Sequence, residues 1–264
     1  MSRIKNMFKA KKAFIPFTVL GDPDFDTSKD IIKAMIDSGA DMLELGFPYS
    51  DPIADGPTIQ LADKRALDAG ATTNRAFRLI KEIRNYSSIP ISLLVYSNLI
   101  YKRGIEKFYK DAEQSGVDGV LVADIPFEES EEYTQAAKKH NISPVFLVAQ
   151  TTTLRRLKQI LKCAGGYLYL VSVLGVTGKR TTVEDATIEL IKRTKMETNI
   201  PLAVGFGVSS PEHVKTLVSS GADGAIVGSA IIQIIERNLS NKKKMIKEIG
   251  AFVKEMKSAL TMRN

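Results

Sequence analysis

Short apolar runs rich in β-branched residues alternate with longer amphipathic segments along the chain. The runs predict eight strands, at Ala13–Leu20, Met42–Gly46, Ile91–Val95, Gly119–Val122, Ser143–Val148, Tyr167–Ser172, Leu202–Gly205 and Gly224–Val227. The segments between them have helical spacing, at Ser28–Ser38, Thr73–Tyr86, Gly104–Ser115, Ser130–His140, Leu154–Lys162, Val183–Met196 and Pro211–Ser219. Strands that are apolar throughout and separated by helices are typical of a parallel sheet buried on both faces.

One turn recurs where a helix leads into a strand. It reads Ser-Gly-Ala-Asp at 38–41 and 220–223, and Ser-Gly-Val-Asp at 115–118. Its glycine can close the helix, and we expect its aspartate to hydrogen-bond local backbone. A βα unit repeated without an intervening linker predicts one α/β domain over residues 1–264, a (β/α)8 TIM barrel. A doubly wound open sheet is the alternative.

Four further helices extend the repeat. A short one is expected within Met1–Lys12, and another around Thr58–Ala69 in the long segment after the second strand. Ile231–Arg237 follows the eighth strand, and Asn241–Lys257 forms an amphipathic helix with a basic outer side.

Composition narrows the class of protein. With 264 residues, 44% hydrophobic and 25% charged, the chain is typical of a soluble globular protein. The net charge of +7 indicates either attraction of an anionic substrate or a lysine-rich solvated surface. Without zinc-finger spacing or an aromatic RNA-binding motif, nucleic-acid binding is not expected. The single cysteine, Cys163, excludes an intramolecular disulfide. With no membrane-spanning run and no signal-peptide pattern, we expect no membrane association and a cytoplasmic location.

Acidic residues mark the second strand and the loop after it. Glu44 interrupts an apolar run, and Asp51 and Asp55 follow in a loop stiffened by prolines. A buried carboxylate is costly without a partner, so its presence indicates acid/base chemistry. Tyr96, Asp124 and Tyr169 also fall in or just after strands, where barrel active sites lie. Asp124 has a second interpretation, as a cap for its own loop.

The last two strands end in glycine-rich turns that predict a phosphate site. Gly205-Phe-Gly207 and Gly228-Ser229 let backbone N–H groups approach an anion, and a short helix follows the second turn. The alternative is that these glycines serve tight turns only. The loop Val173–Thr182 could close over a ligand or could be an ordinary surface loop. His140 and His213 have no cysteine cluster nearby in sequence, so no metal site is expected.

The segment Leu43–Gln60 resembles the signature of the tryptophan synthase α-subunit family. Supporting matches follow in order along the chain, at Pro16–Pro23, Leu121–Asp124, Gly175–Gly178, Gly205–Gly207 and Gly228–Ala230. The resemblance implies a carbon–carbon lyase that splits indole-3-glycerol phosphate into indole and glyceraldehyde 3-phosphate, with no metal or organic cofactor. It also implies a partner, the β subunit, in an α2β2 complex that receives the indole.

The resemblance assigns roles to matching positions. Glu44 would be the general acid/base at the indole carbon bearing the glycerol chain, and Asp55 would hold and deprotonate the indole N–H. The other positions would line the indole pocket, bind phosphate or meet the β subunit. The pocket residues are Phe17, Leu121 and Leu147, with Tyr96 beside them, Tyr169 near the acid and Thr177 bonding Asp55; the phosphate residues are Gly178, Gly207, Gly228 and Ser229; the interface residues are Pro48, Asp51 and Asn98.

Departures from the family pattern leave questions open. Lys179-Arg180 follows Gly178, and we hypothesise that these cations assist closure over the phosphate. The order Phe17-Thr-Val19 is reversed relative to common family members, which leaves the inward-facing residue undecided. Two other functions compete: a weakly catalytic barrel that mainly activates the β subunit, and the synthase that makes indole-3-glycerol phosphate. The latter would be expected to use a lysine acid near the barrel centre, and no predicted strand carries one.

Overall fold

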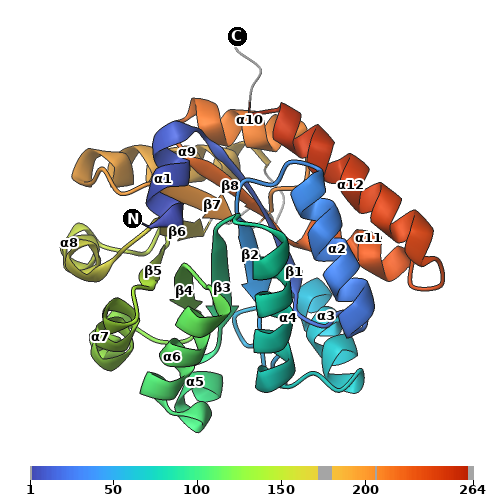
Figure 1. The fold of residues 1–264 in the computed structure, drawn as a ribbon. Helices are drawn as coiled ribbons and strands as arrows, with labels where there is room; N and C mark the ends of the chain where they lie inside the picture. Colours follow the sequence, from blue (N-terminus) through green and yellow to red (C-terminus); the bar gives the residue numbers. More distant parts are fainter. Residues whose placement is uncertain (1, 172–179, 206, 261–264) are drawn as a thin grey trace.

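Eight parallel strands close into a barrel in the computed structural model, which describes residues 2–171, 180–205 and 207–260. The strands pair in sequence order and β8 returns to β1, so the barrel interpretation is confirmed over the open sheet (Figure 1). Each predicted strand is present with ends displaced by at most one residue. The strands are β1 (Ala13–Val19), β2 (Leu43–Gly46), β3 (Ile91–Val95), β4 (Gly119–Val122), β5 (Ser143–Val148), β6 (Leu168–Val171), β7 (Leu202–Gly205) and β8 (Gly224–Val227).

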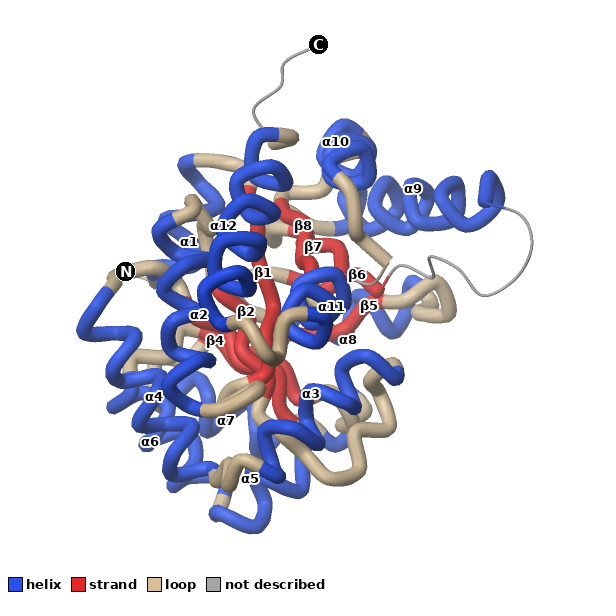
Figure 2. The backbone as a smooth tube through the Cα atoms, turned by 90° about the vertical axis from the view of Figure 1, so that its right-hand side faces the viewer, coloured by secondary structure: helices blue, strands red, loops and turns tan. Residues whose placement is uncertain are grey.

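Helices surround the strands, as the tube view shows (Figure 2). Every predicted helix is present. The helices are α1 (Arg3–Ala10), α2 (Phe25–Asp37), α3 (Pro57–Asp68), α4 (Thr73–Tyr86), α5 (Ser97–Arg103), α6 (Ile105–Ser115), α7 (Glu131–Lys139), α8 (Leu154–Cys163), α9 (Arg180–Glu197), α10 (Pro211–Ser219), α11 (Ser229–Arg237) and α12 (Lys242–Ser258), with a 3-10 turn at Phe127–Glu129. None of these in the described ranges is long and apolar enough to cross a membrane.

Helix α5 was not expected from the sequence, because what starts it is a distant side chain. Asp124, just after β4, accepts hydrogen bonds from the backbone N–H of Ser97 at 2.7 Å and from its hydroxyl at 2.9 Å. A carboxylate at a helix N-terminus satisfies free N–H groups and suits the helix dipole. Asp124 therefore caps a helix after the neighbouring strand β3 and does not serve only as a cap for its own loop.

The aspartates of the recurring turn fasten the amino-terminal end of the barrel. Asp41 accepts the N–H of Phe14 at 2.8 Å, and Asp118 accepts that of Ile91 at 2.9 Å. Asp223 accepts the N–H of Leu202 at 3.0 Å in the same way. Each bond reaches the strand before the aspartate's own, so the expectation of purely local bonding was wrong. Parallel neighbours begin at the same edge of a sheet, which brings each aspartate to the adjacent strand.

Pairs of cations complete these three contacts. Asp118 is paired with Arg3 at 2.9 Å and with Arg84 at 3.0 Å. Asp41 is paired with Lys11 and Lys257, and Asp223 with Lys12 and Lys195. Because α1, α4, α9, α12 and the segment after α1 supply the cations, the clusters hold the helical layer to the barrel.

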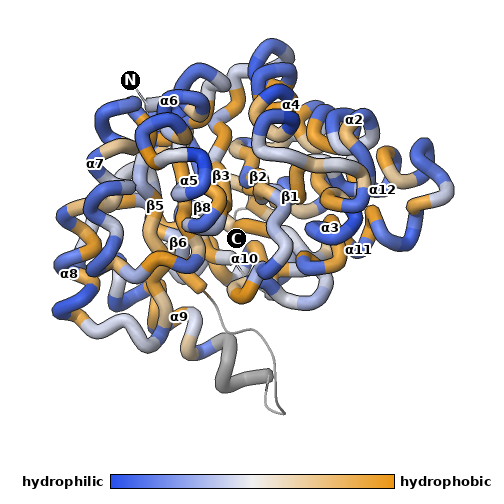
Figure 3. Tube along the Cα trace, turned by 90° about the horizontal axis from the view of Figure 1, so that it is seen from below, coloured by the Kyte–Doolittle hydropathy of each residue, from blue (hydrophilic) through white to orange (hydrophobic). Residues whose placement is uncertain are grey.

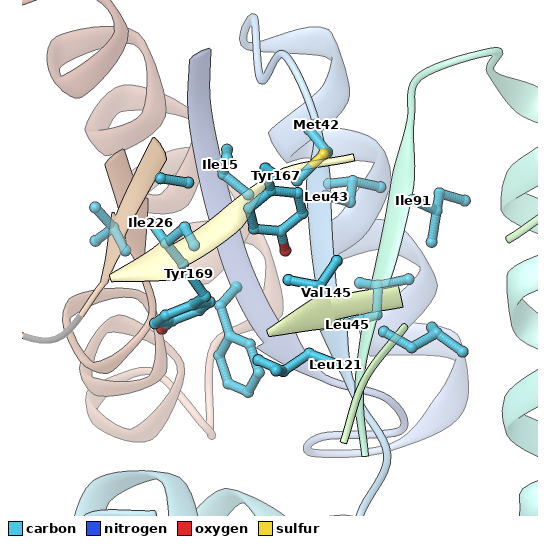
Figure 4. Packing of buried hydrophobic residues seen from close by; sticks show 14 of the residues in the cluster. Ile15, Met42, Leu43, Leu45, Ile91, Leu121, Val145, Tyr167, Tyr169 and Ile226 are labelled. Atoms are coloured by element: carbon cyan, nitrogen blue, oxygen red, sulfur yellow. The ribbon is translucent and has the colours of Figure 1, made fainter. Parts of the chain in front are cut away.

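Buried side chains of neighbouring strands lie at the same level of the barrel. Phe17 is in register with Glu44, which is in register with Ser92, and all three are buried. Figure 3 shows hydrophobic stretches along the strands and mixed stretches along the surrounding helices. In Figure 4 the ring of Tyr167 lies among the apolar side chains of the barrel interior. The chain thus places a carboxyl group within a largely apolar core.

We predict that Asp118→Asn lowers the free energy of unfolding by about 3 kcal/mol, because Arg84 and Arg3 lose the negative charge of their partner and only one neutral amide oxygen remains to accept their N–H groups and that of Ile91. Denaturant unfolding measures the change. The control is Asp68→Asn, which removes an exposed partner of Lys64 and should cost less than about 0.5 kcal/mol. Equal losses in both variants would contradict the role of Asp118 in holding the helical layer to the barrel.

Candidate active site

A cavity of about 300 Å³ opens among residues at the carboxyl ends of the strands. Its walls bring together β1, β2, β3, β6 and β8, the loop before α3, the loop after β7 and the start of α11. The lining residues are Phe17, Glu44, Asp55, Ile59, Leu94, Tyr169, Gly207, Val208, Ser209, Ile226, Gly228, Ser229, Ala230 and Gln233. Both predicted acids and three of the predicted phosphate-binding residues therefore face one space.

Glu44 forms the floor of this cavity and is 1% exposed. Burial raises the pKa of its carboxyl to about 8, with a smaller contribution from the charge of Asp55; the hydrogen bond from Tyr167 opposes the shift. A carboxyl with this pKa is protonated at neutral pH. Glu44 can therefore donate a proton to a substrate atom, as a general acid must.

A chain of hydroxyl groups lies beneath Glu44. The hydroxyl of Tyr167 is 3.2 Å from Oε1 of Glu44 and 3.0 Å from Oγ of Ser92. Burial raises the pKa of Tyr167 well above its usual range, so this hydroxyl keeps its proton. Its single proton can be donated to Glu44 or to Ser92, and the Tyr167 oxygen can accept a hydrogen bond from the other group when that group carries a proton.

Asp55 is held by Tyr96. The Tyr96 hydroxyl donates to Oδ2 of Asp55 at 2.6 Å and accepts the N–H of Ala54 at 3.0 Å. Burial raises the pKa of Asp55, and the hydrogen bond from Tyr96 limits that rise. Tyr96 itself stacks on Tyr49, with ring centroids 4.9 Å apart. The loop acid is thus oriented by a buried tyrosine through its Oδ2.

Phe17 supplies the apolar wall next to Glu44. A Cβ added at Gly46 would lie 2.8 Å from its ring, and one added at Gly228 would lie 2.9 Å from it. Phe17 therefore faces inward while Thr18 faces out, which settles the question raised by the Phe-Thr-Val order. Gly228 also has a packing reason to lack a side chain, in addition to any role in anion binding.

The phosphate end of the cavity is formed by backbone. Gly207 has a φ of +73°, and Gly228 precedes the first residue of α11. The first N–H groups of a helix have no partners within it, and the helix dipole adds a partial positive charge there. Ser229 places a hydroxyl beside these groups at the rim of the cavity. The end opposite the acids can therefore bind an anion.

Comparison with known proteins identifies the family. A family model described as tryptophan synthase alpha chain matches residues 4–261. The chain is 54% identical to the tryptophan synthase alpha chain of Methanoregula boonei, over 98% of both chains. The chain belongs to the tryptophan synthase α-chain family.

Solved structures of the family share the fold. The tryptophan synthase α subunit of Legionella pneumophila superposes with a TM-score of 0.91 at 32% identity, over 98% of both chains. An α subunit from the tryptophan synthase α2β2 complex of Pyrococcus furiosus gives a TM-score of 0.88 at 40% identity, covering 94% of this chain and 99% of that one. The family's site residues remain expectations for this chain, and the geometry places them as follows.

Some predicted site residues lie at the cavity and others do not. Phe17, Glu44, Asp55 and Tyr169 line it, and Tyr96 contacts it only through Asp55. Leu121 and Leu147 are in register with two lining residues, Leu94 and Tyr169, but border a second cavity of about 140 Å³ beside β4 and β5. Thr177, Gly178 and Lys179 lie outside the described residues, as does the side chain of Arg180.

The predicted partner-facing residues differ in exposure. Asp51 and Asn98 are exposed, and Nδ2 of Asn98 donates to the hydroxyl of Tyr49 at 3.2 Å. Pro48 is buried within the chain, so it does not itself present a surface to a partner. His140 pairs with Glu106 and Glu113 and has no contact with the cavity. Among the described residues no cluster of three His, Cys, Asp or Glu side chains could hold a metal ion.

Sequence reasoning missed Tyr167, Ser92 and Gln233. Tyr167 is two residues before Tyr169, so both point to the same side of β6, and this spacing was a usable signal. Ser92 offered a weaker one, as a single polar residue in an apolar strand. Gln233 is one helical turn after Ser229 in α11 and faces the same cavity.

We predict that Glu44→Gln stabilises the chain at pH 7 by about 1–3 kcal/mol while removing its acid. The ordinary pKa of a glutamate, 4.5, applies when the chain is unfolded, and the folded value is about 8. Between these values the unfolded chain releases a proton that the folded chain keeps, so wild-type stability falls as pH rises.

Urea unfolding from pH 4 to pH 9 tests this. The free energy of unfolding of the Gln variant should fall less steeply with pH across this window. Part of the fall should remain, because burial also raises the pKa of Asp63 to about 8. Parallel curves for wild type and variant would contradict a buried, protonated Glu44.

Proposed function

We propose that the chain is the α subunit of tryptophan synthase, a lyase that cleaves indole-3-glycerol phosphate to indole and glyceraldehyde 3-phosphate. Family membership supports the reaction. The single observation that carries the assignment of residues is the pairing of a protonated Glu44 with a tyrosine-held Asp55 in one cavity, with an anion-binding end beyond them.

The cleavage needs one proton to move from a hydroxyl oxygen to a carbon. Glu44 donates its proton to the indole carbon that bears the glycerol chain, which leaves positive charge on the ring nitrogen. Asp55 accepts the ring N–H and stabilises that charge. The ionised Glu44 then takes the proton of the side-chain hydroxyl as the carbon–carbon bond breaks, an aldehyde forms and the bond electrons return to the ring.

The phosphate anchors the substrate at the far end of the cavity. The N–H groups that open α11, the Ser229 hydroxyl and the turn at Gly207 are suited to hold it. Gly178 is proposed to bind the phosphate as well, and Lys179 and Arg180 are proposed to assist closure over it, while Thr177 is proposed to hydrogen-bond Asp55. Anchoring by the non-reacting phosphate supplies binding energy that positions the indole ring against both acids.

The β subunit is the proposed partner, in the α2β2 arrangement of the Pyrococcus furiosus complex. The loop that carries Asp55 also exposes Asp51 and Ile53, the latter 83% exposed, and Tyr101, on the same helix α5 as Asn98, is 74% exposed. Exposed apolar side chains rimmed by polar ones are typical of a protein interface. The proposed location of the complex is the cytoplasm.

Neither competing function explains the buried acid as well. A weakly catalytic barrel that mainly activates the β subunit would gain little from the free energy that burial of Glu44 costs. The synthase that makes indole-3-glycerol phosphate is expected to use a lysine within the barrel, and none of the eight described strands contains a lysine.

We predict that Glu44→Gln and Asp55→Asn each lower kcat for indole release by about 10²–10⁴-fold with the β subunit present. The double variant should lose much less than the product of the two losses, because the acids act on one transition state. Lys64→Gln, which alters an exposed residue of α3, is the control. Activity close to wild type in Glu44→Gln would remove the catalytic assignment.

The pH dependence of kcat/KM gives an independent prediction. The reaction requires Glu44 protonated and Asp55 ionised, so activity should fall on the alkaline side through about pH 8. On the acid side it should fall through the raised pKa of Asp55. Glu44→Gln should lose the alkaline limb from its residual activity; retention of that limb would assign it to another group.

A further inference from the structure

Ser92 is a buried hydroxyl at the level of Glu44. It lies on β3, in register with Glu44 on β2, and is 0% exposed. Its Oγ is 3.0 Å from the hydroxyl of Tyr167, which in turn is 3.2 Å from Glu44. The space it occupies depends on Gly119 of β4, because a Cβ there would lie 3.3 Å from Oγ of Ser92.

We propose that Ser92 is a positioning residue for the cleavage reaction: its hydroxyl orients the hydroxyl of Tyr167, and through it the hydrogen bond that holds Glu44. This inference rests on the proposed function, since it concerns the acid of that reaction. Ser92 does not line the cavity and acts only through Tyr167.

The hydroxyl of Tyr167 carries a single proton, so it donates one hydrogen bond at a time. When Glu44 is ionised, Tyr167 donates to it and Ser92 can donate to the Tyr167 oxygen. When Glu44 is protonated, Tyr167 can turn its proton to Ser92 instead. Both protonation states of Glu44 are thus matched by a complete set of hydrogen bonds, which suits a residue that gives up and regains a proton in each cycle.

Few other ionisable groups act on Glu44. Tyr169 and Tyr167 face it from the sixth strand and the residue before it, and Asp55 faces it from the loop after β2. The hydroxyl of Tyr167 donates to Glu44 at 3.2 Å, so its donor strength matters for the ionised form. Hydrogen bonds in a chain strengthen one another by about 10–30%.

Removal of the Ser92 hydroxyl therefore weakens the support of the ionised carboxylate. The neutral form loses less, because Tyr167 can still donate to the carbonyl oxygen of a protonated Glu44, and a bond to a neutral acceptor depends less on donor strength than a bond to an anion. We expect Ser92→Ala to raise the pKa of Glu44 by about 0.3–0.5 pH unit. The alkaline limb of kcat/KM should move up with it, and kcat should fall about two- to fivefold.

The control is Thr18→Val. Thr18 of β1 is equally buried, and its hydroxyl has no hydrogen-bond partner among the residues that the structure describes. This variant removes a core hydroxyl without breaking a hydrogen bond. It should leave both the pKa of Glu44 and the pH profile unchanged.

The test is an infrared titration of the full-length chain, in which the absorption of the protonated Glu44 carboxyl is identified by its loss in Glu44→Gln. Ser92→Ala, Tyr167→Phe and the double variant are titrated with wild type and Thr18→Val. A shift in Ser92→Ala that disappears in the Tyr167→Phe background supports action through Tyr167. No shift in Ser92→Ala, or the same shift in both backgrounds, overturns the proposal.

The same variants are then assayed for indole release with the β subunit. Because the titration needs no substrate, a wild-type chain that titrates as expected but releases no indole would refute the proposed function alone. A chain that releases indole with no change on Ser92→Ala would refute the role of Ser92 alone.

Discussion

Burial of one carboxyl group in an apolar barrel is the constraint on which the site depends. Glu44 is almost fully enclosed, between Phe17 and Ser92 in register on the neighbouring strands. Water cannot stabilise its charge there, so the proton is retained to about pH 8. Burial of the carboxyl costs free energy of folding, and the same burial keeps Glu44 protonated. An exposed glutamate would be ionised and unable to act as an acid at neutral pH.

The second acid has a different environment because it serves a different purpose. Asp55 lies on a loop, less deeply buried, with the Tyr96 hydroxyl as a donor. Its ionised form is therefore favoured relative to that of Glu44. The two environments thus favour a protonated Glu44 and an ionised Asp55. One carboxyl group can then donate a proton while the other accepts the N–H of the substrate.

The two ends of the barrel have different roles, since one stabilises the fold and the other carries the candidate active site. At the amino-terminal end, Asp41, Asp118 and Asp223 bond adjacent strands and pair with cations from the helical layer. At the carboxyl-terminal end, polar groups are left for a ligand, and glycines at 46, 205 and 228 make room for Phe17 and Tyr169. Rigid fastening at one end permits unpaired polar groups at the other, as in barrels generally.

The sequence by itself determined the barrel, the position of nearly every strand and helix, and the location of both acids. Those features follow from local periodicity and turn residues, and the strand pattern alone sends Glu44 to the carboxyl-terminal end of β2. The glycine turns of the phosphate end were equally visible. Helix α5 was not, since its cap at Asp124 is 27 residues away.

Tertiary structure alone decided how the acids are tuned. Tyr167 contacts Glu44 across 123 residues of sequence and Ser92 across 75, and no local pattern pairs them. The tertiary structure also places Tyr96, which was predicted beside the indole pocket, in a hydrogen bond with Asp55. Pro48, predicted at the interface, is buried. A pKa depends on what surrounds a group in space, and closure of the barrel brings together strands that the chain order keeps far apart.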